Sequence, residues 1–111
     1  MTAIYNMFVP QGTTFTLTVT FIARNLTSYT ARMQGRTSFD AASTAWDWTT
    51  ANGYLSIAAA TDSILTITAT AAQTAALTAG EGVYDIELVS PGGVVDRPFQ
   101  GTYTIDAEVT R

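Results

Sequence analysis

The sequence predicts an all-β chain, and three features of its residues support that fold class. Thr makes up about a fifth of the 111 residues, and its branched side chain suits a pleated, half-exposed surface. Several segments alternate apolar and polar residues with a period of two. Gly, Pro and Asn residues that form turns separate these segments at short intervals.

The first half of the chain holds the clearest strands. Residues 4–9 form a short expected strand that ends at Pro10-Gln11-Gly12. In residues 13–21 every second residue is Thr, and the residues between them from 15 onward are apolar, so this strand has one hydroxyl face and one apolar face. Residues 29–36 alternate in the same way.

The middle of the chain is less regular. Residues 37–52 show no clear period, and Asn52-Gly53 predicts a turn at their end. Strands are expected to follow at residues 54–57 and 63–70.

One segment favours a helix. Residues 71–77 are rich in Ala, Thr70 is suited to cap the first turn, and Gly80 follows the last. We expect one or two helical turns that cross between two sheets.

The last third of the chain returns to alternation. Strands are expected at residues 83–89, 94–99 and 103–109, with a turn at 90–93. Pro98 and Gly101 are expected to interrupt the return strand, as a β-bulge. The whole pattern predicts a single domain over residues 1–111, an immunoglobulin-like β-sandwich of about seven to eight antiparallel strands with one short helical turn near residues 71–77.

Several kinds of chemistry are missing from the composition. The sequence contains no Cys, His or Lys, and its five basic residues are all Arg. These absences remove the thiolate nucleophile, the commonest general base and the Schiff-base amine. A net charge of -4 gives nucleic acid no electrostatic attraction. We therefore expect no enzyme activity, no cofactor and no nucleic-acid partner.

The low charge content bears on assembly. Charged residues make up 13% of the chain, about half the usual share for a soluble domain. A surface with so little charge is typical of a protein that is covered by partners, so we expect a homo-oligomer. The N-terminal residues lack the pattern of a signal peptide, and no run approaches the ~20 apolar residues of a membrane span. We therefore expect synthesis in the cytoplasm and no membrane partner.

Four carboxylates form the strongest candidate for a metal or catalytic site. Asp85 and Glu87 share one strand face, and Asp106 and Glu108 share another. If the two strands were neighbours, the carboxylates would suit Ca²⁺ or a glycosidase pair. The alternative is two solvated faces, with Glu87 paired across the hairpin to Arg97, and we favour it. The sequence therefore predicts no catalytic and no metal residues.

Two groups of residues are candidate partner contacts. Trp46 and Trp48 lie two residues apart and, with Tyr54, either form an aromatic platform for sugar rings or pack in the core or against another subunit. Arg32, Gln34 and Arg36 form a polar stripe on one strand, which suits contacts with a partner's carboxylates or is simply solvated.

Two segments of the sequence resemble a known family. They are NLTSYTARMQ at residues 25–34 and VYDIEL at 83–88, which continues through PGGVVDR at 91–97 and GT at 101–102 to EVTR at 108–111. In this order they resemble small proteins encoded by tailed bacteriophages and prophages, often near tail or fibre genes. That family is similar to the immunoglobulin-like N-terminal modules of phage upper baseplate proteins. Gly35 departs from the pattern, where an apolar residue is expected, and residues 37–48 have no counterpart.

The resemblance implies a function without catalysis. We expect a virion structural protein that attaches or links parts of the tail, baseplate or fibre, with other virion proteins as partners and the virion as its location. One alternative is a decoration (cement) protein of the phage head. Another is a carbohydrate-binding module for host adhesion that uses Trp46, Trp48 and Tyr54.

Overall fold

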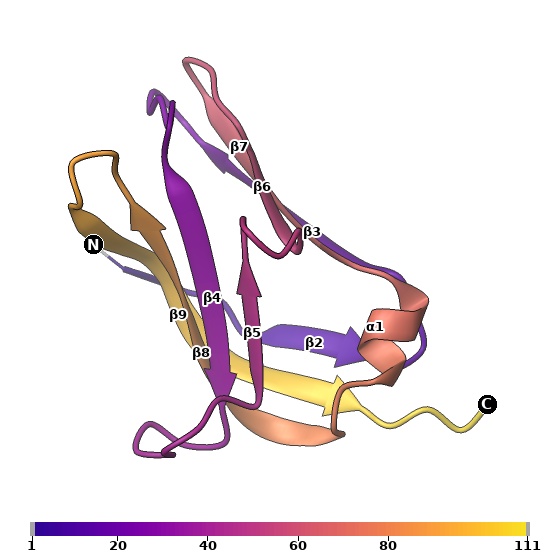
Figure 1. Cartoon of the computed structure of the whole chain (residues 1–111). Coiled ribbons are helices and arrows are strands. Elements are labelled where there is room, and N and C mark those ends of the chain that lie inside the picture. Colours follow the sequence, from indigo (N-terminus) through magenta and orange to yellow (C-terminus); the bar gives the residue numbers. More distant parts are fainter. Residues whose placement is uncertain (1, 111) are drawn as a thin grey trace.

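Residues 2–110, which the computed structural model describes, form two β-sheets packed face to face (Figure 1). The large sheet has the strand order β1-β9-β8-β4-β5, with β2 also paired to β9, and the small sheet has the order β3-β7-β6. The strands are β1 (Ala3–Ile4), β2 (Met7–Pro10), β3 (Phe15–Phe21), β4 (Thr30–Arg36), β5 (Trp46–Thr49), β6 (Leu55–Ala58), β7 (Ser63–Ala69), β8 (Gly80–Val89) and β9 (Val95–Asp106). The all-β sandwich is therefore confirmed.

The core lies between the two sheets and follows from the alternation in the sequence. Inward residues of β4, β7 and β8 are buried, whereas most of their outward neighbours are exposed or half-buried. In β3 the apolar residues are only half-buried and the threonines are exposed, as the period predicts. The buried apolar residues are Met7, Val9, Leu26, Ala31, Met33, Trp46, Trp48, Leu55, Leu65, Ile67, Ala69, Tyr84, Ile86, Leu88, Tyr103 and Ile105.

The N-terminal segment differs from the expected antiparallel strand. It forms two strands, β1 and β2, and both run parallel to β9. Between them the Asn6 side chain, instead of backbone, accepts the N–H of Thr102 at 3.2 Å. The register stays the same on both sides of this break, because Ile4 pairs with Gln100 and Met7 with Tyr103.

The segment expected to be irregular contains a further strand. β5 pairs antiparallel with β4 and forms one outer edge of the large sheet. The turn at Asn52-Gly53 then carries the chain across to β6 in the small sheet, and Gly53 has a φ of 88°. The strands expected at residues 94–99 and 103–109 form one strand, β9, which ends at Asp106. With this fusion, the N-terminal split and β5, residues 2–110 contain nine strands where seven to eight were expected.

The bulge at Pro98 is confirmed, and the one at Gly101 is wrong. Ile86 pairs with Phe99 and Leu88 with Asp96, so Glu87 alone lies opposite both Arg97 and Pro98. Gly101 pairs with Tyr84 inside the regular ladder. A Cβ at Gly101 would lie 2.2 Å from the carbonyl oxygen of Tyr5, so this glycine lets the N-terminal segment approach β9.

The helix is α1 (Ala71–Ala75), shorter than the expected residues 71–77. Thr70 caps it as predicted: its hydroxyl accepts the Gln73 N–H at 3.2 Å, and the Gln73 side chain accepts the Thr70 N–H at 2.8 Å. Thr74 is buried and donates to the carbonyl of Thr13, which ties the helix to the start of β3. This helix is far too short to cross a bilayer, and residues 2–110 contain no other that would.

Candidate interaction surface

The polar stripe predicted on β4 lies on the outer face of the large sheet. Ala31 and Met33 point into the core, so the alternating Arg32, Gln34 and Arg36 point outward. Arg32 is exposed, and the other two are half-buried. The stripe therefore meets the outward residues of β8, which pairs with β4 along its length.

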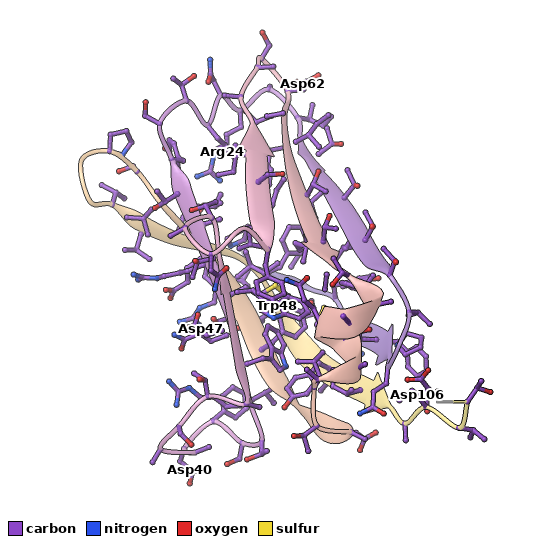
Figure 2. All side chains as sticks on the ribbon, turned by 45° about the vertical axis from the view of Figure 1, so that its right-hand side comes forward. Arg24, Asp40, Asp47, Trp48, Asp62 and Asp106 are labelled. Atoms are coloured by element: carbon purple, nitrogen blue, oxygen red, sulfur yellow. The ribbon has the colours of Figure 1, made fainter. Side chains whose placement is uncertain are left out.

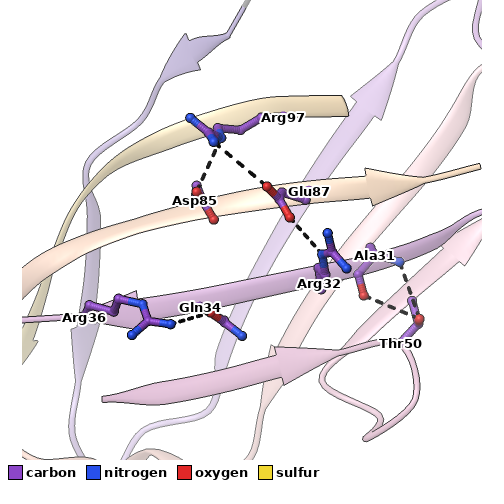
Figure 3. Close-up of polar contacts among 8 residues, drawn as sticks. All are labelled: Ala31, Arg32, Gln34, Arg36, Thr50, Asp85, Glu87 and Arg97. Atoms are coloured by element: carbon purple, nitrogen blue, oxygen red, sulfur yellow. Dashed lines mark hydrogen bonds and ion pairs between the residues drawn. The ribbon is translucent and has the colours of Figure 1, made fainter. Parts of the chain in front are cut away.

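Four charged side chains cross three strands of this face (Figure 3). Arg32 Nε lies 2.8 Å from Glu87 Oε1. Arg97 Nε lies 3.4 Å from Asp85 Oδ2, and its Nη2 lies 4.0 Å from Glu87 Oε2. The pairing of Glu87 with Arg97 is thus confirmed, and the β9 bulge at Arg97-Pro98 places Arg97 between both carboxylates. Asp85 and Glu87 are therefore paired with arginines, as favoured, but they are partly buried on this face, with side chains 38% and 23% exposed.

Asp85 is the member of this charged group whose ionised form is disfavoured. Burial raises the pKa of its carboxyl above the usual value, and the neighbouring Glu87 raises it further. Arg97, Arg32 and Arg36 act in the opposite direction but do not reverse the shift. A hydrogen-bond donor or cation brought by a partner would therefore relieve this carboxylate.

A groove of about 430 Å³ lies beside these charged side chains on the same face of the large sheet. Its polar lining includes Gln34, Arg36, Asp85 and Gln100, so it contains both charge signs and amide groups. Apolar Ile4 and Phe39 also line it, and their side chains are 74% and 88% exposed. Such mixed polar and apolar linings are typical of protein-binding surfaces. The other residues of the groove are Asn6, Val83, Tyr84, Arg97, Gly101 and Thr102.

Arg36 also shapes the groove. Its Nη1 donates to the carbonyl of Ala41 at 2.9 Å, and its Nη2 donates to Gln34 Oε1 at 3.2 Å. The first contact holds the loop over residues 37–45, which carries Phe39, against the end of β4. Arg36 thus anchors an exposed aromatic ring at the groove.

The aromatic candidates lie elsewhere. Trp46 and Trp48 are 6% and 2% exposed, and Figure 2 shows Trp48 inside the molecule and Asp47 on the outside. Tyr54 is half-buried and stacks on Trp48 with ring centroids 5.0 Å apart. The predicted aromatic platform for a partner or a sugar is therefore wrong, because these rings pack in the core. The alternative, that these rings pack in the core, is confirmed.

Gly35 explains how two tryptophans fit there. It lies opposite Trp46 in the β4–β5 ladder, and a Cβ on it would lie 2.2 Å from the Trp46 indole. The glycine at position 35 thus has a local cause, because a side chain there would displace the Trp46 ring. Gly35 and Trp46 can both be read in the sequence, but only the β4–β5 register places one opposite the other.

The four carboxylates do not come together. β8 and β9 are neighbours, but Asp85 pairs with Gln100, so Asp106 lies six residues further along, about 20 Å away at strand spacing. Asp106 lies at the end of the molecule that carries the C-terminus (Figure 2). Within residues 2–110 no three of the His, Cys, Asp and Glu side chains form a group suited to a metal ion.

Sequence reasoning did not single out Ile4, Phe39 or Gln100 as surface residues. Gln100 and Ile4 reach the groove because β1 pairs parallel with β9, a pairing between residues 96 positions apart. Phe39 gave one usable signal: it is a large aromatic residue in a polar loop with no alternation around it.

Comparison with known proteins adds little. No family model matches the chain, and no curated protein matches it. Among solved structures, the extracellular portion of mouse CD200RLa is similar over 95% of this chain and 56% of its own length, with 15% identity and a TM-score of 0.40.

Proposed function

We propose that this chain is a structural protein of a tailed bacteriophage particle, which links parts of the tail, baseplate or fibre and catalyses no reaction. Two sequence blocks, at residues 25–34 and 83–111, support it through their resemblance to phage-encoded proteins. Both blocks supply residues of the same outer face: the first contributes Arg32 and Gln34, and the second contributes Asp85, Arg97 and Gln100.

The groove on the large sheet carries this proposal. Ile4 and Phe39 leave large apolar side chains in water next to charged and amide groups. A neighbouring protein gains by covering them, since each buried aliphatic or aromatic side chain contributes about 1.5–3 kcal/mol. A partner strand or loop with one apolar anchor and a few polar groups suits this lining.

The test uses substitutions that leave the core alone. In particles produced with the Ile4→Ser/Phe39→Ser variant, we expect at least a tenfold loss of the chain from purified particles, measured by mass spectrometry. Ile22→Ser is the matched control, because Ile22 is as exposed as Ile4, at 74%, and does not line the groove. The control should be incorporated like the unchanged chain, and all three proteins should unfold at the same temperature.

Imaging the particles locates the chain. With a tag on the C-terminal residues, we expect label on the tail, baseplate or fibre. Label over the head surface would instead support the decoration protein. Absence of the unchanged chain from purified particles would contradict both functions.

A further inference from the structure

β3 is the longest strand at an edge of either sheet. It has seven residues, whereas the other outer strands, β1, β2, β5 and β6, have two or four. On one side β3 pairs with β7 over its whole length, and no strand in residues 2–110 pairs with its other side.

The free side of β3 offers a regular set of backbone groups. The Thr68 N–H donates to the carbonyl of Tyr54, so Thr68 and every second residue of β7 face β6. The alternate residues of β7 face β3, where they pair with Phe15, Leu17, Val19 and Phe21. The N–H and C=O groups of the intervening Thr16, Thr18 and Thr20 therefore point away from the sheet.

This edge lacks the features that keep natural edges from pairing. Residues 13–21 contain no charged residue and no Pro, and no bulge interrupts the β3–β7 register. By contrast, β5 carries Asp47, and β2 ends at Pro10. A charged residue at the centre of β3 would face the same charge on a second, antiparallel copy and repel it. Residues 13–21 contain no charged residue.

The sequence of β3 is also symmetric about Thr18. Reading outward in both directions, Leu17 matches Val19, Thr16 matches Thr20, and Phe15 matches Phe21. An antiparallel partner strand with the same sequence therefore places apolar residues beside apolar residues and threonines beside threonines. A two-fold dimer requires this kind of self-complementary patch.

We propose that a second copy of this chain binds along β3, with the two β3 strands antiparallel about a two-fold axis at Thr18. The two small sheets then join into one six-stranded sheet. Thr18 exchanges two backbone hydrogen bonds with the partner's Thr18, and each Thr16 exchanges two with the opposite Thr20. The proposal does not depend on the phage function.

The packing beside β3 supports the same occupant. An apolar cleft of about 290 Å³ lies between β3 and the large sheet, lined in part by Leu17, Val19, Ile86 and Phe99. Leu17 and Val19 are only half-buried in the single chain. In the dimer each Leu17 lies beside the partner's Val19 at the mouth of this cleft, so both lose exposed apolar area.

Single cysteines test the register, because the chain has no Cys of its own. A short bifunctional thiol reagent is expected to link most of the Thr18→Cys chains as dimers, since paired residues lie about 5.5 Å apart. Thr16→Cys alone should not link, because its two copies lie about 14 Å apart at ~3.4 Å per residue. Mixing Thr16→Cys with Thr20→Cys should restore the link.

Thr18→Pro tests whether the strand edge holds the dimer. Its N–H points outward, so Pro leaves the β3–β7 bonds intact and blocks the incoming strand. We expect the unchanged chain to sediment as a dimer and Thr18→Pro as a monomer with native circular dichroism. For the cysteine-linking experiment, Thr68→Cys is the control. Thr68 is exposed on the central strand of the same sheet, so its thiols should not be linked.

Three results would overturn the proposal. They are a monomeric unchanged chain at all concentrations, linking of Thr16→Cys as strong as that of Thr18→Cys, and open-ended oligomers. Loss of the Ile4/Phe39 effect on particles would overturn the proposed function and leave these results unchanged.

Discussion

Gly35 is the residue on which the packing of the two tryptophans depends. Its missing side chain leaves room for the Trp46 indole, which lies 4.5 Å from Trp48 and 5.3 Å from Tyr103 between ring centroids. Gly35→Ala forces a methyl group into this ring, so we expect a loss of about 1–3 kcal/mol in the free energy of unfolding. Urea denaturation measures it.

Gly92→Ala is the control for this change. Gly92 lies in a turn, its φ is not positive, and a Cβ there meets nothing closer than 3.9 Å. Its free energy of unfolding should change by less than about 0.5 kcal/mol. Equal losses in the two variants would contradict the assignment of the Gly35 effect to contact with Trp46, because a Cβ at Gly92 meets no such neighbour.

Tyr84 makes the stability depend on pH in the alkaline range. Burial raises the pKa of Tyr84 from 10.0 to about 12, with a smaller contribution from Tyr5. Its hydroxyl donates to the Tyr5 carbonyl at 2.5 Å. The neutral phenol is favoured in the fold, so its stabilisation is complete below about pH 10 and is lost as the pH rises toward 12.

Tyr84→Phe separates this contribution from the rest. At pH 8 we expect the variant to be less stable by about 1 kcal/mol, the usual value of one hydrogen bond. Between pH 10 and 12 the difference from the unchanged chain should shrink in urea titrations. A difference that stays constant through this range would contradict the assignment to the Tyr84 hydroxyl.

The helix α1 is five residues long, so its stability depends on its cap more than on propensity. Thr70→Ala removes the acceptor for the Gln73 N–H, and we expect a loss of about 1 kcal/mol in thermal or urea unfolding. Thr78→Ala, an exposed position after the helix, should have no measurable effect. If both variants lose the same stability, the capping box contributes nothing.

The N-terminal strands β1 and β2 pair with β9, which lies at the other end of the sequence. Val9 is fully buried, whereas its neighbour Phe8 is 56% exposed. Val9→Ala leaves a cavity under β9, so we expect a loss of about 2 kcal/mol in urea unfolding. Phe8→Ala removes more atoms but should cost less than about 0.5 kcal/mol. The reverse order would mean that β2 does not pack as described.

The molecule as a whole has two proposed contact regions. The groove lies on the outer face of the large sheet. The free edge is that of β3 in the small sheet (Figure 1). A dimer through β3 therefore leaves a groove available on each copy. A linking protein benefits from this arrangement, because two copies bind a repeated partner with higher effective affinity than one.

Local sequence patterns alone determined the sandwich, the strands β3, β4, β6, β7 and β8, the Thr70 cap and the Pro98 bulge. These features depend on neighbours in sequence, where period and turn chemistry act directly. The strands expected at residues 94–99 and 103–109 instead form the single strand β9. Tertiary structure alone decided the parallel pairing of β1 and β2 with β9, the burial of Trp46 against Gly35 and the place of Ile4 in the groove. Each of these joins residues whose contact depends on strand register, and local sequence carries no record of which distant strand will lie alongside.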